Sequence, residues 1–424
     1  MSPIRPDVTV IGRRMEPEDH RLRDFLTRTA QPHRFLEAGS DEASDLLLSL
    51  GLDDLPLPIL LDGDTVFAPA SVEAVADAWG ASRPPLQEHY DIVIVGAGPA
   101  GLAAAVYASS DGLSTTLIDE DVPGGQASHT SMIENFFGFP DGIGGAELAR
   151  MAGRQAERFG TELQMLRRVE TGVFTPGEPM RFGLAGGYEI TASVAIAATG
   201  MVWRRLEVDG VDELLDRGVY YGAGRSEAAQ CANDDVVVIG GGNSAGQAVL
   251  NLANAGARVR MVVRGSALAA SMSAYLIDRI DVHPLIELRL ESQVTEVFDE
   301  ADHLVAVTIM GAGGNAERVP AAALFICIGG QPCTWWAEAT GVQVDDRGYV
   351  MTGPDLLGPA GARPGSWPLD RDPLALETSI PGLFAAGDVR HGSTKRVGGA
   401  VGEGAMAVAL AHHRLQELLG AASG

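Results

Sequence analysis

The chain has 424 residues, of which 46% are apolar and 21% charged. This is the composition of a soluble globular protein, and the length allows about two to four domains. The 31 basic and 56 acidic residues give a formal charge of −25, which argues against nucleic acid or an anionic lipid surface as a partner.

The chain has three cysteines, Cys231, Cys327 and Cys333, and they form no CxxC. The sequence therefore supports neither a disulfide framework nor a cysteine metal site, and a reducing compartment is the default. It shows no secretory signal and no run of about 18 apolar residues. We expect a cytoplasmic protein that does not span a membrane.

Residues 7–80 alternate short apolar runs with amphipathic ones, which predicts the order β-α-β-α-β-β-α. The runs are VTVIG, EDHRLRDFLTRTA, HRFLE, DEASDLLLSLG, LPILLDGDTVFA and SVEAVADAWG. This order, with Pro58 ahead of the third strand, resembles the thioredoxin or glutaredoxin fold. In that family a redox CxxC follows the first strand and the proline is cis. The corresponding place here is GRRMEPED, which contains no cysteine.

The resemblance implies that residues 1–82 form a thioredoxin- or glutaredoxin-like domain. Such a domain would dock a partner or a thiol-containing ligand without exchanging a disulfide itself. The alternative is a small α/β domain that braces the rest of the chain or mediates self-association. Residues 83–89 follow as a polar linker, because the pair Pro84-Pro85 within them stiffens the chain and interrupts strand and helix.

A second unit begins at Tyr90 with YDIVIVGAGPAGLAAAVYASSDG, which predicts a buried strand, a tight glycine turn and a helix. Gly96 permits the turn, and Gly98 lets the backbone approach a pyrophosphate. Gly101 lets the helix pack closely on the strand, while the helix N-terminus offers free N–H groups to the anion. The predicted cofactor-binding residues of this turn are Gly96, Gly98, Pro99, Ala100 and Gly101.

The next predicted strand lies in STTLIDED and ends at Asp119 and Glu120. In dinucleotide-binding units an acidic residue about 20 positions after the turn binds the ribose hydroxyls. This context, with a strand before the turn and a helix after it, predicts a dinucleotide site.

A second copy of the pattern is DDVVVIGGGNSAGQAVLNLANAGARVRMVVRG. Its predicted cofactor-binding residues are Gly240, Gly242, Asn243, Ser244 and Ala245. The strand that follows ends at Arg264 rather than at an acid, and a guanidinium suits the 2′-phosphate of NADPH. A solvated surface charge is the alternative role for Arg264. Two dinucleotide sites in one chain imply hydride transfer between them and point to a flavoprotein.

The chain resembles the low-molecular-weight thioredoxin reductase family from about residue 90 to residue 420. The matching segments, in order, are GAGPAG, PGGQASHTSMIENFFGFPDGIGG, AIAATG, LFICIGGQP, TSIPGLFAAGDVR and KRVGGAVGEGAMAVALAHHRL. The resemblance implies an α/β fold with two Rossmann-like, three-layer ββα domains. The FAD domain would comprise residues 90–205 and 327–424, with an NADPH domain at 206–326 inserted in it. It also implies a homodimer and a rotation of one domain against the other.

The same resemblance assigns contacts around the flavin. Those near the ring and ribityl chain are Gly125, Gln126 and Asn135, and those of the second FAD segment are Gly387, Asp388, Lys395, Arg396 and Val397. Asp388 would bind the ribityl chain, and the final helix would direct its N-terminus at the isoalloxazine. A basic cluster that includes Lys395 and Arg396 would stabilise anionic reduced flavin, unless it pairs with the acidic surface.

One departure from the family decides the expected chemistry. The family carries CATCDG after a GV(S/F)(Y/F) step, and its two cysteines relay electrons to thioredoxin. Here GVYY is followed by GAGR, so Gly222 and Arg225 stand where the cysteines would be. We therefore expect electrons to pass from the flavin directly to an external acceptor.

Three residues are catalytic candidates. His129 and His391 are possible proton donors to a leaving thiolate, because imidazole titrates near neutral pH. Cys231 lies on the predicted short helix SEAAQCA and is the one nearby thiol that could form a mixed disulfide. Structural roles are the alternative for all three, and for Cys231 we favour packing.

The sequence thus predicts an NADPH-dependent FAD oxidoreductase whose acceptor is a small-molecule or protein disulfide. A ferredoxin- or quinone-type reductase, a thiol oxidase, and a non-catalytic flavin-binding redox sensor remain the alternatives. The segment 353–377 is rich in proline and glycine and predicts a surface excursion between strands.

Overall fold

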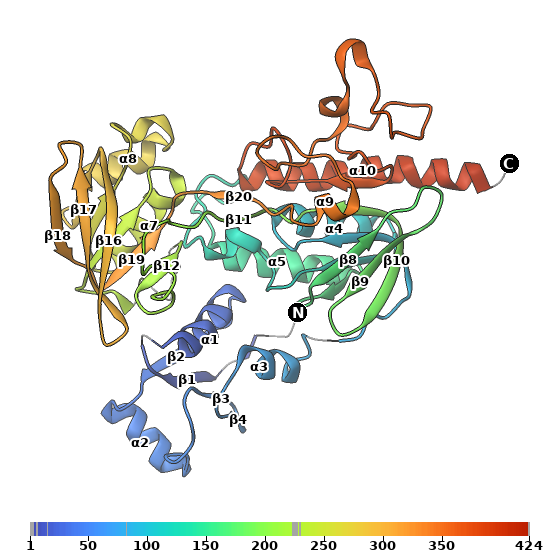
Figure 1. The fold of residues 1–424 in the computed structure, drawn as a ribbon. Coiled ribbons are helices and arrows are strands. Elements are labelled where there is room, and N and C mark those ends of the chain that lie inside the picture. Colours follow the sequence, from blue (N-terminus) through green and yellow to red (C-terminus); the bar gives the residue numbers. More distant parts are fainter. Residues whose placement is uncertain are drawn as a thin grey trace.

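The computed structural model describes residues 4–5, 7–14, 16–81, 83–222, 228 and 230–422. For residues 421 and 422 it describes the backbone alone. Figure 1 shows an N-terminal unit lying against two larger sheet-containing units. The α/β class predicted from the sequence is confirmed. None of the helices in the described ranges is long and apolar enough to cross a membrane.

The N-terminal unit has the predicted order of elements. These are β1 (Val8–Gly12), α1 (Pro17–Arg28), β2 (His33–Glu37), α2 (Asp41–Leu50), β3 (Ile59–Asp62), β4 (Thr65–Phe67) and α3 (Val72–Ala78). Its sheet has the order β2-β1-β3-β4, in which β1 and β2 are parallel and the other pairs antiparallel. Ser40 and Ser71 cap α2 and α3 by accepting a backbone N–H, and α1 begins with Pro17, which needs no such partner. The Leu57–Pro58 peptide bond is cis.

The second unit is built on a sheet in the order β7-β6-β5-β10-β9-β8, with β21 paired to β10. Its strands are β5 (His89–Val95), β6 (Thr115–Ile118), β7 (Glu162–Gln164), β8 (Val169–Val173), β9 (Met180–Leu184), β10 (Tyr188–Ala197) and β21 (Leu383–Ala385). Its helices are α4 (Pro99–Ser110), η1 (Gly125–His129), α5 (Gly145–Arg158) and α10 (Val397–Ala422). Because β5 runs parallel to both β6 and β10, the carboxyl ends of these strands share one edge.

The third unit has a parallel sheet in the order β12-β19-β13-β14-β15 and a three-stranded antiparallel sheet β16-β17-β18. The parallel strands are β12 (Val219–Tyr221), β13 (Asp235–Ile239), β14 (Arg258–Val262), β15 (Ile286–Arg289) and β19 (Ala323–Ile326). The others are β16 (Ser292–Glu300), β17 (His303–Gly311) and β18 (Ala316–Pro320), with helices α7 (Asn243–Asn254), η2 (Leu268–Ala270) and α8 (Ala274–Asp281).

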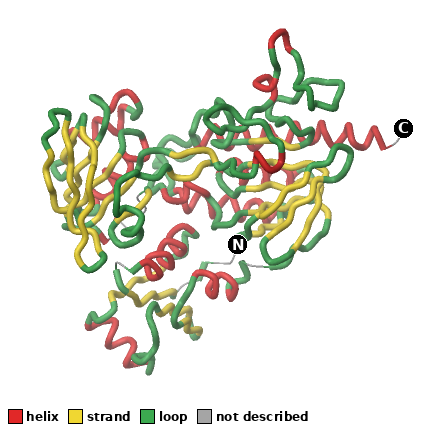
Figure 2. The backbone as a smooth tube through the Cα atoms, viewed as in Figure 1, coloured by secondary structure: helices red, strands yellow, loops and turns green. Residues whose placement is uncertain are grey.

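The chain enters and leaves the third unit through one small ribbon. Strand β11 (Met201–Trp203) pairs antiparallel with β20 (Gly330–Pro332), so the two crossing segments lie side by side. After β20 come α9 (Ala337–Thr340), η3 (Gly353–Leu356) and η4 (Pro359–Gly361). Figure 2 shows that the 353–377 excursion is mostly loop, as predicted.

The excursion is fixed at its base by a buried ion pair. Arg371 contacts Glu377, whose side chain is 0% exposed, at 2.6 Å. The same guanidinium reaches Glu417 of α10 at 2.6 Å. These contacts tie the returning chain to the last helix just before β21.

Candidate active site

The first glycine turn has the packing that its sequence predicts. A Cβ added at Gly101 would overlap the carbonyl oxygen of Gly96, and one added at Gly96 would overlap the carbonyl of Ala198, so α4 lies directly on β5. A Cβ added at Gly98 would meet no heavy atom within 4 Å. The backbone is therefore bare on the side where a pyrophosphate would approach the start of α4, which suits an anion.

Asp119 stands at the end of β6, beside this turn. Its carboxylate accepts hydrogen bonds from the backbone N–H groups of Ala97 at 2.5 Å and Asp121 at 2.9 Å. Burial raises the pKa of Asp119 to about 6, although the two backbone hydrogen bonds work against that rise. Glu120 is exposed next to it. The carboxylate is thus held in the orientation that the dinucleotide motif requires.

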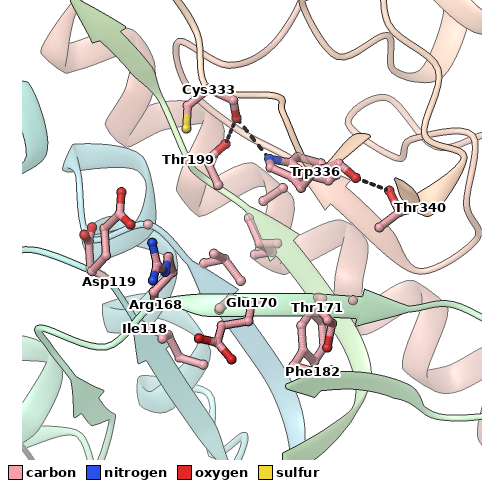
Figure 3. A pocket seen from close by; sticks show the side chains of 18 of the residues that line it. Ile118, Asp119, Arg168, Glu170, Thr171, Phe182, Thr199, Cys333, Trp336 and Thr340 are labelled. Atoms are coloured by element: carbon pink, nitrogen blue, oxygen red, sulfur yellow. Dashed lines mark hydrogen bonds between the residues drawn. The ribbon is translucent and has the colours of Figure 1, made fainter. Parts of the chain in front are cut away.

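A cavity of about 140 Å³ opens at this edge of the sheet, and Asp119 lies in its wall. Figure 3 shows Arg168 and Glu170 of the neighbouring hairpin on one side and Trp336 and Cys333 on the other. Both Thr199 and the Trp336 indole donate to the Cys333 carbonyl, at 2.8 and 2.9 Å.

Mostly apolar walls with the Asp119 carboxylate at the edge suit the adenosine end of FAD. From the sequence we assigned no site role to Cys333 or Trp336, and we missed Arg168. The hydrogen bond from Thr199 to Cys333 joins positions 134 residues apart, so no local pattern signals this side of the cavity.

The segment expected at the flavin packs on the same turn. The N–H of Gly124 donates to the carbonyl of Ala97 at 2.7 Å, and Gly125, with φ of 50°, lies against Gly98. The Gln126 amide donates to the carbonyl of Met201 at 2.8 Å, which links the segment to β11. Asn135 is exposed further along the loop.

The second FAD segment forms a network around the start of α10. The backbone N–H of Gly387 donates to Glu403 at 2.8 Å. Lys395 donates to the carbonyl of Asp388 at 2.5 Å and lies over the Tyr349 ring. Burial raises the pKa of Asp388, partly offset by Lys395, and burial lowers the pKa of Lys395. Val397 is the first residue of α10, so the free backbone N–H groups at the start of this helix lie close to Asp388 and Lys395.

The neighbouring basic residues are paired with acids. Arg390 contacts Glu403 at 2.8 Å. His391 is exposed and contacts Asp345 at 2.6 Å. Burial works to raise the pKa of Asp345, but the hydrogen bonds from His391 and from two backbone N–H groups bring it below its ordinary value. Arg390 and His391, close to the predicted Lys395 and Arg396 cluster, are thus each paired with a carboxylate.

The second glycine turn opens on a larger cavity of about 450 Å³. Gly242 precedes α7 and, like Gly98, has no heavy atom within 4 Å of an added Cβ. Arg264 is exposed in the cavity wall, at the expected distance past the turn. Arg396, from the start of α10, lines the same cavity. The dinucleotide site of the third unit therefore reaches the edge of the FAD unit.

A small chamber of about 70 Å³ lies where these two units meet. It is lined by Gln126, His129, Thr130, Ser131, Trp203, Gly222, Ser244, Gln247, Ala248 and Cys327. The Gln247 amide donates to the carbonyl of Met132 at 3.2 Å, and Arg279 contacts Glu134 at 2.9 Å, so the two units also touch directly. Sequence reasoning anticipated His129 but missed Trp203 and Gln247.

Trp203 takes up space beside the position of the missing dithiol. A Cβ added at Gly222 would lie 3.3 Å from the Trp203 ring, and Gly222 has φ of 81°. His129 packs edge-on against the same indole, with ring centroids 6.3 Å apart. Arg225 and three positions of the predicted helix, 226, 227 and 229, lie outside the described residues.

Two of the cysteines are buried, and one of them, Cys327, lines this chamber. Cys231 is 6% exposed and belongs to the apolar core of the third unit, together with Val236 and Val249. Cys327 is also 6% exposed, and burial raises the pKa of its thiol to about 12. A thiol with so high a pKa is a poor nucleophile at neutral pH.

Comparison with known proteins identifies the class to which this fold and site belong. A family model described as pyridine nucleotide-disulphide oxidoreductase matches residues 90–404. Thioredoxin reductase 1 of Arabidopsis thaliana, a mitochondrial protein, is 32% identical over 370 residues, covering 84% of this chain and 92% of its own. Thioredoxin reductase of Bacillus subtilis is 32% identical over 330 residues, covering 78% and 96%.

The solved structure of Lactococcus lactis thioredoxin reductase, in its FR conformation, is similar with a TM-score of 0.68 and 28% identity, covering 77% of this chain and 99% of its own. The chain belongs to the pyridine nucleotide-disulphide oxidoreductase family. Within that family it is a thioredoxin reductase-like FAD-dependent NAD(P)H oxidoreductase, with FAD and NADPH as its cofactors.

Proposed function

We propose that this enzyme reduces an external disulfide with NADPH and uses no dithiol of its own. The overall change would convert NADPH, a proton and a disulfide into NADP⁺ and two thiols. Bound FAD would supply the two-electron step between the nicotinamide and the disulfide. The observation that carries the proposal is a chamber between the two predicted dinucleotide sites, where Gly222, at one position of the missing dithiol, lies beside the Trp203 ring.

The residues that would hold each cofactor are already oriented. The bare turns at Gly98 and Gly242 suit the two pyrophosphates, and Asp119 suits the adenosine ribose of FAD. Arg264 would bind the 2′-phosphate of NADPH by charge. Arg396 lines the proposed NADPH cavity from the start of α10, which brings this cavity next to the second FAD segment.

His129 is the proposed proton source for the leaving thiolate. It lines the junction chamber with Gln126 and packs on Trp203. An imidazole in a chamber with polar walls can hold and release a proton there. His391, exposed and paired with Asp345, is the second candidate.

Three further expectations belong to the proposal. The N-terminal unit would be a thioredoxin-like domain that helps to seat the acceptor, and the enzyme would act as a cytoplasmic homodimer. The strand order β2-β1-β3-β4 of the N-terminal unit, with helices between the strands, supports the thioredoxin-like assignment. Cys231 would contribute packing, given its place in the apolar core.

Anaerobic reduction with NADPH tests the proposal directly. The visible flavin band should bleach, and a panel of low-molecular-weight disulfides, protein disulfides, ferredoxins and quinones should then be added one at a time. Reoxidation by a disulfide supports the proposal. Reoxidation by ferredoxin or quinone alone would overturn it, and Cys231→Ser should turn over at the parental rate.

A further inference from the structure

Residues 119–128, which run from the end of β6 into η1 and are called the 119–128 loop, join the two ends of the FAD site. Asp119, at its start, stands in the wall of the adenosine cavity. Gly124 and Gly125, at its end, pack on the phosphate-binding turn. The loop therefore sets how far the ribose-binding carboxylate lies from the flavin-side turn.

The middle of this loop is anchored in the N-terminal unit. Val122 is 3% exposed and belongs to the same apolar core as Leu22, Phe25 and Leu26 of α1. Leu166, which follows β7, packs on that core as well. The core of the N-terminal unit is therefore completed by residues of the FAD unit.

A second, polar anchor comes from the last residue of α1. Arg28 is 8% exposed, and its NH2 group donates to the Asp121 carboxylate at 2.6 Å. Its Nε donates to the Ser128 hydroxyl at 3.0 Å. An i,i+4 contact to Asp24 at 3.4 Å holds the guanidinium from its own helix.

Both partners of Arg28 are in turn hydrogen-bonded to residues of the FAD site. The Ser128 hydroxyl donates to the carbonyl of Gly125 at 2.7 Å. The N–H of Asp121 donates to the carboxylate of Asp119 at 2.9 Å. One planar guanidinium thus holds the loop at two points, close to each of its functional ends.

We propose that Arg28 is a positioning residue of the FAD site, and that the N-terminal domain completes this site by holding the 119–128 loop. The forked geometry is what the position requires, because two donors in a fixed plane set the separation of Asp121 and Ser128. A lysine ammonium at the same place is a point charge and holds only one of them firmly. This inference rests on the FAD site and is independent of the acceptor.

The test uses the full chain with Arg28→Met, Arg28→Lys and Ser128→Ala. FAD is removed and added back, and its Kd is measured by fluorescence quenching. The absorption band and midpoint potential of the bound flavin are recorded too, because a purely structural role would leave them unchanged. Arg34→Met is the matched control, since Arg34 pairs with Glu42 on the exposed side of the same domain.

We expect Arg28→Met to raise the Kd of FAD roughly ten- to hundredfold, as for a lost hydrogen bond to a charged group. The flavin band or potential should shift with it, Arg28→Lys should recover part of the loss, and Arg34→Met should match the parent. A parental Kd, band and potential in Arg28→Met would overturn the proposal, whatever its thermal stability. If Arg28→Met does not fold, parental values in Ser128→Ala would overturn it instead.

Discussion

Replacing Arg264 with glutamine should selectively weaken the use of NADPH. Arg264 is exposed in the wall of the NADPH cavity, just past β14, and glutamine keeps much of its length while removing its charge. At about 4 Å two unit charges attract by roughly 1 kcal/mol in water and 4 kcal/mol near a protein surface. For an exposed guanidinium and a phosphate we take about 1–3 kcal/mol, which is a five- to hundredfold loss of affinity.

The assay is anaerobic stopped-flow bleaching of the flavin with NADPH and, separately, with NADH. The concentration of NADPH that gives half the maximal rate should rise by that factor, while the value for NADH should stay within about twofold. Added salt should reduce the preference of the parent enzyme for NADPH over NADH, because the contact between Arg264 and the 2′-phosphate would be exposed. Arg260→Gln is the control, since Arg260 pairs with Asp235 and Glu287 instead. Equal losses with both nucleotides would refute the assignment.

Three other perturbations follow from the geometry. Gly101→Ala should lower the urea concentration at half-unfolding, because its Cβ would overlap backbone, whereas Gly98→Ala should leave that midpoint unchanged in the FAD-free protein and weaken FAD binding. Equal unfolding midpoints for the two variants would contradict this. Burial raises the pKa of Asp119 to about 6, so the carboxylate that would bind the ribose is protonated as the pH falls through 6. The affinity for FAD should therefore fall by up to about tenfold per pH unit below that point, and an affinity that does not change with pH would contradict this. Arg371→Met should cost about 3–5 kcal/mol of unfolding free energy, because it leaves the buried Glu377 carboxylate without its cation; a loss under about 1 kcal/mol would show that the pair is solvated.

Local sequence patterns predicted the elements and the two turns because the physics there is local. The alternation in residues 7–80 follows from the periods of strands and helices, and it gave every element of the N-terminal unit in order. The glycines at Gly96 and Gly101 are dictated by close backbone contacts within one turn.

The remaining parts of the site depend on contacts between distant segments. The Trp336 wall of the adenosine cavity, the Trp203 ring beside Gly222, and the Glu403 carboxylate under Gly387 each come from another part of the chain. No periodicity or motif marks such residues, because their neighbours are set only when the sheets assemble. The pairing of His391 with Asp345 was out of reach for the same reason.

The place of Val122 also bears on how the protein is made. About 40 residues separate the last helix of the N-terminal unit from this valine, so the ribosome releases the first domain before its core can close. A chain cut near residue 82 would leave an apolar socket on one fragment and an uncovered Val122 on the other. We therefore expect the two parts to be more stable in one chain than as separate fragments.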